Sequence, residues 1–393
     1  RDTFILFFKG LINKLKLVYI LIALYLCARM TRTEKISKPE GDISLIHHCI
    51  LNNENVFKDG SINCTYFNSL PIWLKKRGIK VFGLPWLFRN RPSLKFYRNL
   101  RKTDCFIPED WLSIRDYFSI FKNSIKSLTA LSIKSPYPGA EINDLIFHEK
   151  LGEMSEQGEI FWRYIPAIKK WSEKITSITV YDQFYSMIFE HPLRYIIKKL
   201  PIKSTTIGFY HTIVSKEFLA NQHLESEWES QVKPDFVACT GKIAKDLLLR
   251  QGVPKEKILS VAALRQNFFD SNNKLERKSP KQLLILLSMV TESFVETLIK
   301  VYSNNSIIIN EFNLKVKVRN HPMISREYIL KKTKWNSLPK GWEWSKNDLN
   351  CDLKESYCCI AMDTGSVYDA ILSGCILIPL MKDLDLMENY LDF

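Results

Sequence analysis

Hydrophobic residues along most of this chain follow two alternating periods. Short apolar, β-branched runs such as "ISLIHHCIL" and "ITSITVYDQ" are typical of buried strands. Stretches such as "DWLSIRDYFSIFKNSIKSLTAL" instead place apolar residues three and four positions apart, as an amphipathic helix does. From Ile43 onward the two kinds of segment take turns, and Gly78 and Gly252 stand where two of the helices are expected to end. Strands that alternate with helices predict parallel sheets joined by crossover helices.

A polar stretch, "QNFFDSNNKLERKSPK", interrupts this alternation before it resumes with "QLLILLSM". A chain of 393 residues is also too long for one ordinary core. We therefore predict an α/β fold with two Rossmann-like domains that face each other across a cleft. The expected domains are an acceptor-side domain at 41–270 and a nucleotide-binding domain at 271–393, preceded by an apolar helical segment at 1–40.

The first segment, "FILFFKGLINKLKLVYILIALYLCARM", is apolar, but its uninterrupted run from Leu17 to Ala28 is shorter than a bilayer span. Three interpretations stay open: a buried helix, an interfacial helix with Lys14 and Lys16 at its edge, and a signal or anchor segment. The chain starts with Arg and stops at "LMENYLDF", so we expect a fragment with an incomplete C-terminal domain.

Composition is ordinary for a globular protein, with 46% hydrophobic and 25% charged residues, but the net charge of +14 is not. Such a charge favours nucleotides, acidic polysaccharides or an anionic membrane as partners. No zinc-finger or other nucleic-acid motif accompanies the basic residues, so we expect no nucleic-acid partner. The nine cysteines form no paired C-x-x-C motifs and are odd in number, which favours a reducing cytosol and predicts no metal site.

The strand-like run "VKVRNHP" ends in four residues of a different character. Val316 and Val318 alternate with a lysine, and Arg319, Asn320, His321 and Pro322 follow. Proline cannot continue the ladder and holds the preceding residue extended. His321 is therefore expected at a strand tip, where open α/β sheets bind ligands, although an imidazole that merely caps a turn is the alternative.

A second tip is predicted in "MDTGSVYDAILSG". A strand ends near Met362, and Thr364, Gly365 and Ser366 lead into a helix whose first amides and hydroxyls suit a phosphate. Simple N-capping by Thr364 or Ser366 is the alternative. We expect this element and His321 at successive strand tips of one sheet, where they would hold a nucleotide phosphate.

The combination of "HP" with "TGS…DAILSG" resembles the GT-B glycosyltransferases of bacterial surface carbohydrate biosynthesis. It is similar in particular to the group of sialyltransferases, polysialyltransferases and capsule Kdo-transferases, with their HP and serine motifs. The resemblance runs from about residue 40 to the end and includes "PDFVACTGKIAKDLLLRQGVPKEKILSVAALR". It implies that His321, Thr364 and Ser366 hold the donor phosphate without a metal ion or other cofactor. The Asp-Leu-Asp of "DLDLM" (383–387) is interpreted as a loop.

That group also uses an acidic general base in a motif of which this sequence has no clean copy. Asp182 in "VYDQF", Glu190 in "IFEHP" and His211 in "GFYHT" are the candidate catalytic residues, because each follows a strand or begins a helix. The alternatives are helix capping for Asp182, favourable first-turn placement for Glu190 and a structural role for His211.

Arg265, at the end of "AALR", is a further candidate for binding donor phosphate or a carboxylate. Tyr181 and Tyr210 could stack on a sugar ring or pack in the core.

These residues predict a metal-independent glycosyltransferase that moves a sugar from a nucleotide-activated donor to a surface glycan or lipid-linked acceptor. A CMP-linked acidic sugar is favoured over a UDP-linked one. The expected location is cytoplasmic, with peripheral contact at the inner membrane face allowed by the basic N-terminal half. A teichoic-acid-type polyol-phosphate transferase and a non-catalytic GT-B-like binding protein are the alternatives.

Overall fold

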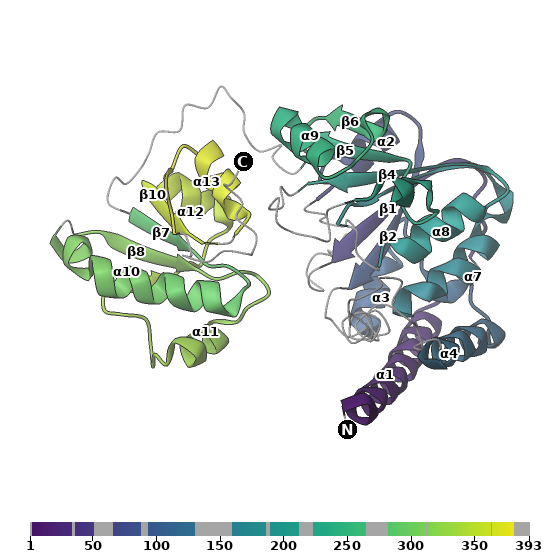
Figure 1. Cartoon of the computed structure of the whole chain (residues 1–393), viewed down its shortest axis with the longest axis horizontal. Helices are drawn as coiled ribbons and strands as arrows, with labels where there is room; N and C mark the ends of the chain where they lie inside the picture. Colours follow the sequence, from purple (N-terminus) through teal and green to yellow (C-terminus); the bar gives the residue numbers. More distant parts are fainter. Residues whose placement is uncertain are drawn as a thin grey trace, which may run out of the picture. The chain divides into compact units, whose positions relative to one another are not determined.

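The computed structural model describes residues 2–33, 36–50, 66–87, 93–129, 159–185, 189–211, 223–264, 282–311, 313–362 and 364–380. The described residues fall into two compact units, one up to Leu264 and the other from Gln282. We call them the first and the second unit, and each is built around its own sheet (Figure 1).

The first unit contains a six-stranded sheet in which every neighbouring pair is parallel, in the order β2-β1-β3-β4-β5-β6. Strand β1 alternates its apolar side chains between the two faces of the sheet. Ile43 and Leu45 of β1 belong to one core, and Ile46 belongs to the other. The strands are β1 (Gly41–Ile50), β2 (Lys80–Leu87), β3 (Ile175–Gln183), β4 (Lys203–Tyr210), β5 (Phe236–Thr240) and β6 (Ile258–Val261).

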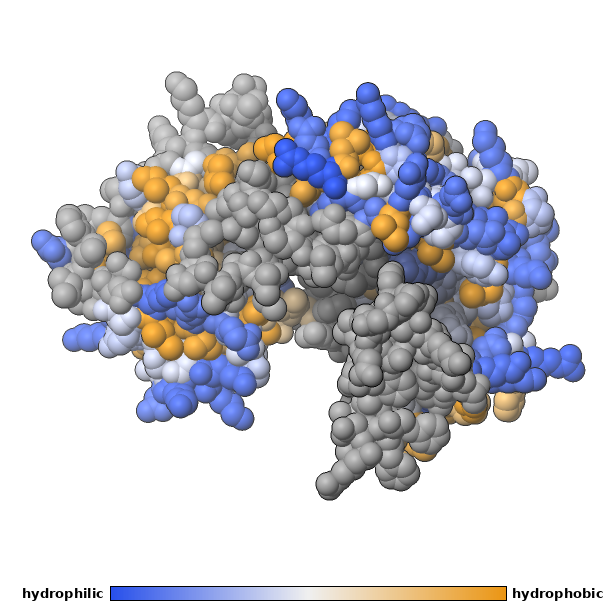
Figure 2. Space-filling model, in the orientation of Figure 1, coloured by the Kyte–Doolittle hydropathy of each residue, from blue (hydrophilic) through white to orange (hydrophobic). Residues whose placement is uncertain are grey.

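Helices cover both faces of this sheet (Figure 1). The apolar sides of α7 and α8 pack on Ile43, Leu45 and Val180, whereas Leu74 of α2 packs on the opposite face. On the face drawn in Figure 2, hydrophilic residues cover much of the first unit. The α-helices are α1 (Asp2–Met30), α2 (Leu70–Lys76), α3 (Leu94–Leu100), α4 (Ile114–Thr129), α7 (Tyr164–Trp171), α8 (His191–Lys199) and α9 (Gly241–Arg250), and the 3-10 helices are η2 (Pro108–Asp110), η3 (Ile160–Arg163), η4 (Ser172–Lys174), η6 (Glu225–Glu229) and η7 (Lys255–Lys257).

The second unit contains a five-stranded parallel sheet in the order β11-β10-β7-β8-β9. All five residues of β7 are buried, as expected for the central strand of a sheet covered on both sides. Helices α10 and α11 pack on one face, and α12 and α13 pack on the other. The elements are β7 (Gln282–Leu286), α10 (Thr291–Glu311), β8 (Lys315–Arg319), α11 (Arg326–Thr333), β9 (Trp342–Trp344), α12 (Leu349–Glu355), β10 (Cys358–Ala361), α13 (Ser366–Leu372) and β11 (Ile376–Pro379).

The predicted fold class is confirmed, because both sheets are parallel and alternate with helices. Gly78 and Gly252 follow their helices with φ of +75° and +85°, which only glycine adopts without strain. The predicted domain boundary near 270 lies in 265–281, outside the described residues. The sequence interpretation missed α11, β9 and α12, which together span Arg326–Glu355.

The predicted N-terminal helix is present as α1 and packs beside α4 (Figure 1). Of the three open interpretations, the interfacial helix placed Lys14 at its edge, but this side chain is buried and its Nζ lies 2.5 Å from Oε1 of Glu159. By length and composition, Gly10–Met30 is apolar enough to cross a membrane, and a third of it is buried in the protein. One face of α1 is thus part of the first unit.

Candidate functional site

The strand order of the second unit fixes where a ligand would bind. The chain adds β8 and β9 on one side of β7, then returns to add β10 and β11 on the other side. Where the order of strand addition reverses, the chain segments that follow two neighbouring strands leave toward opposite sides. This opens a crevice at the carboxyl ends of these two strands, and open α/β sheets bind their ligands in such a crevice. Here that point lies between β7 and β10, next to Ser288 and to the Thr364–Ser366 turn.

His321 and Thr364 do not lie at successive strand tips, as the sequence interpretation expected. They follow β8 and β10, and β7 runs between these two strands. Two strand spacings of about 4.8 Å separate the tips by about 10 Å. Both residues nevertheless follow strands at the carboxyl edge of the same sheet, with the end of β7 between them.

Hydrogen bonds order the turn that carries His321. Nδ2 of Asn320 donates to the carbonyl oxygen of Ile324 at 2.8 Å, and the amide of Ile324 donates to the His321 carbonyl at 2.9 Å. The backbone amide of Met323 donates to Nδ1 of His321 at 3.2 Å. A ring nitrogen that accepts a bond carries no proton, so the proton of the neutral imidazole is on Nε2. The half-buried His321 thus carries its proton on Nε2, and Pro322 in the same turn is exposed.

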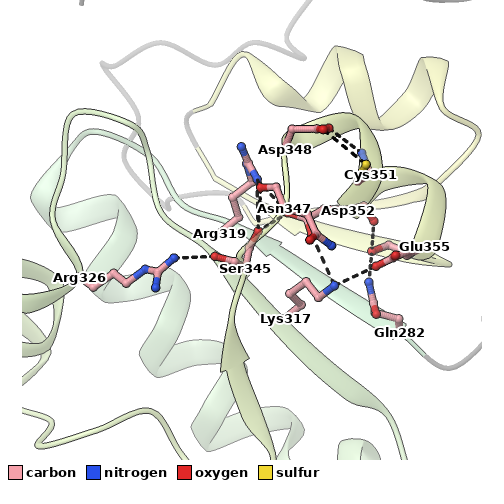
Figure 3. Close-up of polar contacts among 11 residues, drawn as sticks. Gln282, Lys317, Arg319, Arg326, Ser345, Asn347, Asp348, Cys351, Asp352 and Glu355 are labelled. Atoms are coloured by element: carbon pink, nitrogen blue, oxygen red, sulfur yellow. Dashed lines mark hydrogen bonds and ion pairs between the residues drawn. The ribbon is translucent and has the colours of Figure 1, made fainter. Parts of the chain in front are cut away.

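Arg319, at the end of β8, is anchored by a single amino group (Figure 3). Its Nη1 donates to Oδ2 of Asp352 at 2.8 Å, to Oγ of Ser345 at 3.2 Å and to the Asn347 carbonyl at 2.8 Å. Among the residues that the structure describes, neither Nη2 nor Nε has a hydrogen-bond partner. The guanidinium is therefore held in place while two of its donor groups stay available to an anion.

Asp352 is the centre of this network (Figure 3). Its carboxylate is fully buried and also accepts a short hydrogen bond from the hydroxyl of Ser345, while Nζ of Lys317 lies 3.5 Å from its Oδ1. Burial lowers the pKa of Lys317, but Glu355 at 3.0 Å and Asp352 outweigh it and hold this pKa above its usual value. Sequence reasoning missed Asp352 and Ser345, because both belong to the segment in which it found no elements.

The Thr364–Ser366 turn begins α13, which is seven residues long. Thr364 is buried, and its hydroxyl accepts the Ser366 amide at a long 3.4 Å. The N-cap residue of α13 is Gly365, and no side chain caps the helix, so the structure does not show the N-capping by Thr364 or Ser366 that was the alternative. Gly365 and Ser366 are half-buried. The structure places this turn at the carboxyl edge of the second sheet, and its role with phosphate stays a prediction.

Asp182 and Glu190 meet in the interior of the first unit. Nε and Nη2 of Arg194 donate to the two carboxylate oxygens of Asp182 at 2.8 and 3.1 Å, and Nη2 lies 2.7 Å from Oε2 of Glu190. All three side chains are essentially unexposed. Burial raises the pKa of Asp182 to about 6, although Arg194 opposes this shift. Neither carboxylate faces solvent, so this geometry favours a structural role for both. The spacing of Glu190 and Arg194, four positions apart on a helix, was the available sequence signal.

His211 follows β4, the strand next to β3, and is half-buried. The hydroxyl of Tyr185 makes a short hydrogen bond with its Nε2, and its Nδ1 lies 3.5 Å from the Phe209 carbonyl oxygen. A carbonyl only accepts, so the proton is on Nδ1 and Nε2 accepts from Tyr185. The centroid of the Tyr66 ring lies 4.2 Å from that of the imidazole. Oε1 of Glu190 accepts the backbone amide of Tyr185 at 2.8 Å, which connects the buried carboxylates to this pair.

The remaining candidates do not join these sites. Tyr210 is buried, and Tyr181 packs against the core around Ile46 and Phe209, so core packing is the better description of both. Arg265 and the Asp-Leu-Asp at 383–385 lie outside the described residues. Within the described ranges, no group of three His, Cys, Asp or Glu side chains could hold a metal ion.

No protein-family model matches this chain, and no curated protein matches its sequence. Solved structures to which this chain is similar include a mutant of S. aureus TarM in complex with Fondaparinux, alpha-GlcNAc-glycerol and UDP, at 10% identity and a TM-score of 0.46, over 87% of this chain and 85% of that one. The UDP-GlcNAc 2-epimerase of Methanocaldococcus jannaschii has 14% identity and a TM-score of 0.44, over 86% and 83% of the two chains. The Neisseria meningitidis epimerase bound to UDP-GlcNAc has 10% identity and a TM-score of 0.43, over 88% and 84%. Likenesses of this size carry no functional assignment.

Proposed function

We propose that this protein is a GT-B glycosyltransferase that moves a sugar from a nucleotide-activated donor to a glycan or lipid-linked acceptor. The observation that carries the proposal is the set of anion-binding groups at the carboxyl edge of the second sheet. Arg319, anchored on Asp352, and the Nε2–H of His321 both lie at the tip of β8. The Thr364–Ser366 turn follows β10 on the other side of the reversal in strand order.

On the donor side, these groups would bind the phosphate of the nucleotide. As the bond between the anomeric carbon and the phosphate oxygen breaks, its electron pair stays with the nucleotide and negative charge grows on that oxygen. Donors already in place lower the energy of this charge without having to reorganise. Arg319 supplies positive charge at this edge, and we propose on this ground that no metal ion is needed. The HP and serine motifs favour CMP as the nucleotide and an acidic sugar as its cargo.

On the acceptor side, we propose His211 as the general base, acting through Tyr185. The acceptor oxygen forms the new bond to the anomeric carbon and gives its proton to the phenol oxygen of Tyr185. The phenol proton moves along the existing hydrogen bond to Nε2 of His211. Glu190 would act from the interior by holding the backbone amide of Tyr185, and Asp182 by holding Arg194, which pairs with Glu190.

The test is calorimetric titration with CMP, CDP, UDP and GDP. Wild-type protein is expected to bind one of them, and His321→Asn is expected to bind it about 10- to 100-fold more weakly, as for the loss of one charge-assisted hydrogen bond. Asparagine keeps an acceptor near the position of Nδ1 and so preserves the turn, whereas it removes the Nε2 donor. His321→Gln places an amide near Nε2 and should recover part of the affinity.

Lys340→Ala is the control, because Lys340 is exposed and precedes β9, at the opposite edge of the sheet. Equal affinity of His321→Asn and the control would remove His321 from the donor site. If folded wild-type protein bound none of the four nucleotides, the proposed glycosyltransferase function would be refuted. If product analysis showed that an alcohol phosphate had been transferred to the acceptor, the polyol-phosphate transferase would be favoured instead.

A further inference from the structure

Helix α1 is fixed along the surface of the first unit by its inner face. Leu17, Leu21 and Ala28 on this face are buried. Lys14 on the same face is paired with Glu159, which also accepts the hydroxyl of Ser124 in α4 at 2.5 Å. This inner face belongs to the protein core, so the docked helix lies on the unit and does not cross a bilayer.

The outer face of α1 is a continuous apolar stripe. Its members recur three or four positions apart, so they lie on one side of the helix. Each is between 42% and 69% exposed. Between the first and the last, the stripe is about 29 Å long at 1.5 Å per residue. The residues of the stripe are Leu11, Leu15, Tyr19, Ile22, Leu26 and Met30.

The neighbouring helix extends this surface. Tyr117 of α4 lies against Tyr25 of α1, with ring centroids 5.6 Å apart, so the two helices are in contact. Ile114 and Phe118, one turn apart on α4, are 63% and 69% exposed. Monomeric proteins rarely expose apolar surface of this extent unless it contacts a partner.

The charge around the stripe identifies the partner. Among their described side chains, helices α1, α3 and α4 carry exposed cations and no exposed carboxylate, since Asp116 is half-buried and paired with Lys170. An apolar helical face bordered by cations is the composition that binds an anionic lipid surface. A protein partner or a second copy of this chain would have to supply the complementary negative charge. The exposed cations are Lys16, Arg29, Lys95, Arg98, Arg115, Lys122 and Lys126.

We propose that the outer face of α1, extended by α4, docks the first unit onto an anionic bilayer. The apolar stripe lies at the boundary between headgroups and acyl chains, parallel to the membrane plane, and the surrounding lysines and arginines contact the headgroup phosphates. This docking does not depend on the reaction proposed above, and its test needs no substrate.

The experiment is flotation of the whole chain with vesicles of phosphatidylcholine, alone or mixed with phosphatidylglycerol. Wild-type protein is expected to float with the mixed vesicles, less with the neutral ones, and less again at high salt. The double variant Leu15→Glu with Ile22→Glu should bind at least about tenfold more weakly, because both side chains are exposed and glutamate both adds repulsion and removes apolar area. Lys122→Glu should weaken binding to the mixed vesicles only.

The matched control is Ile243→Glu with Leu249→Glu, which makes the same change at exposed positions of α9 on the same unit. It should float like wild type, and circular dichroism should show all variants folded. Equal flotation of the α1 variant and the control would overturn the proposal. So would a dimer, detected by light scattering without lipid, that the α1 variant dissociates, because the stripe would then face a second copy.

Discussion

Removal of Arg194 should destabilise the first unit more than any change at its surface. Arg194→Met leaves Asp182 and Glu190, both essentially unexposed, without the cation that lies between them. Leaving a buried ion unpaired costs about 3–5 kcal/mol, against a total stability of about 5–15 kcal/mol for a typical domain. At about 1.4 kcal/mol per factor of ten, amide exchange that requires unfolding of this unit should become faster by about two to four orders of magnitude.

The assay is hydrogen exchange followed by mass spectrometry, because it reports on each unit separately. Peptides from β3 should exchange faster in Arg194→Met, whereas peptides from β8 in the second unit should not change. Arg250→Met removes an exposed arginine from α9 of the same unit and is the control.

The penalty should also depend on pH. Burial already raises the pKa of Asp182 to about 6, and loss of Arg194 removes the interaction that opposes this shift. A carboxyl group whose pKa is raised in the folded state destabilises the protein at pH values above that pKa. The penalty becomes smaller as the pH falls below the raised pKa of Asp182, and it vanishes below the pKa near 4 that an aspartate has in the unfolded chain. The ratio of variant to wild-type exchange in β3 should therefore be larger at pH 7.5 than at pH 5. A ratio near one, or a ratio independent of pH, would refute the description of this cluster as a buried, charge-compensated triad.

Three further outcomes are expected. Tyr185→Phe and His211→Gln should each lower kcat of sugar transfer by at least about 100-fold. The double variant should lose no more activity than the stronger single variant, because both residues act on the same proton. Losses that add up in the double variant would show that the two residues have separate roles. Asp352→Ala should remove the acceptor that anchors Arg319 and weaken nucleotide binding about tenfold in calorimetry. Unchanged affinity would show that the network is only structural. Gly252→Ala should lower the Tm by several degrees, because φ at this position is +85° and the new Cβ would lie 2.2 Å from the backbone carbonyl oxygen of His223. An unchanged Tm would contradict the geometry of this turn.

The order of strands and helices could be predicted from the sequence, because it depends on local properties. The apolar run of β7, the alternation of valine and lysine in β8 and the helical spacing of other segments identify strands and amphipathic helices without knowledge of their neighbours. Pro322 likewise places His321 at the end of a strand from local backbone geometry alone. The segment Arg326–Glu355 was missed because its short elements are largely polar and carry no clear period.

The site depended on contacts between distant segments. Asp182 and Glu190 have the sequence context of strand-tip and helix-start carboxylates, and only packing of α8 on the sheet brings Arg194 between them and removes both from solvent. Apolar residues occur on almost every side of α1, so the hydrophobic pattern of the sequence does not indicate which side faces the core. The structure shows the side, because Lys14 is buried there and pairs with Glu159. Strand order is set by which edges pair in three dimensions, and it places β7 between His321 and Thr364. Sequence patterns record the local preferences of each segment, whereas burial and proximity are properties of the assembled sheets.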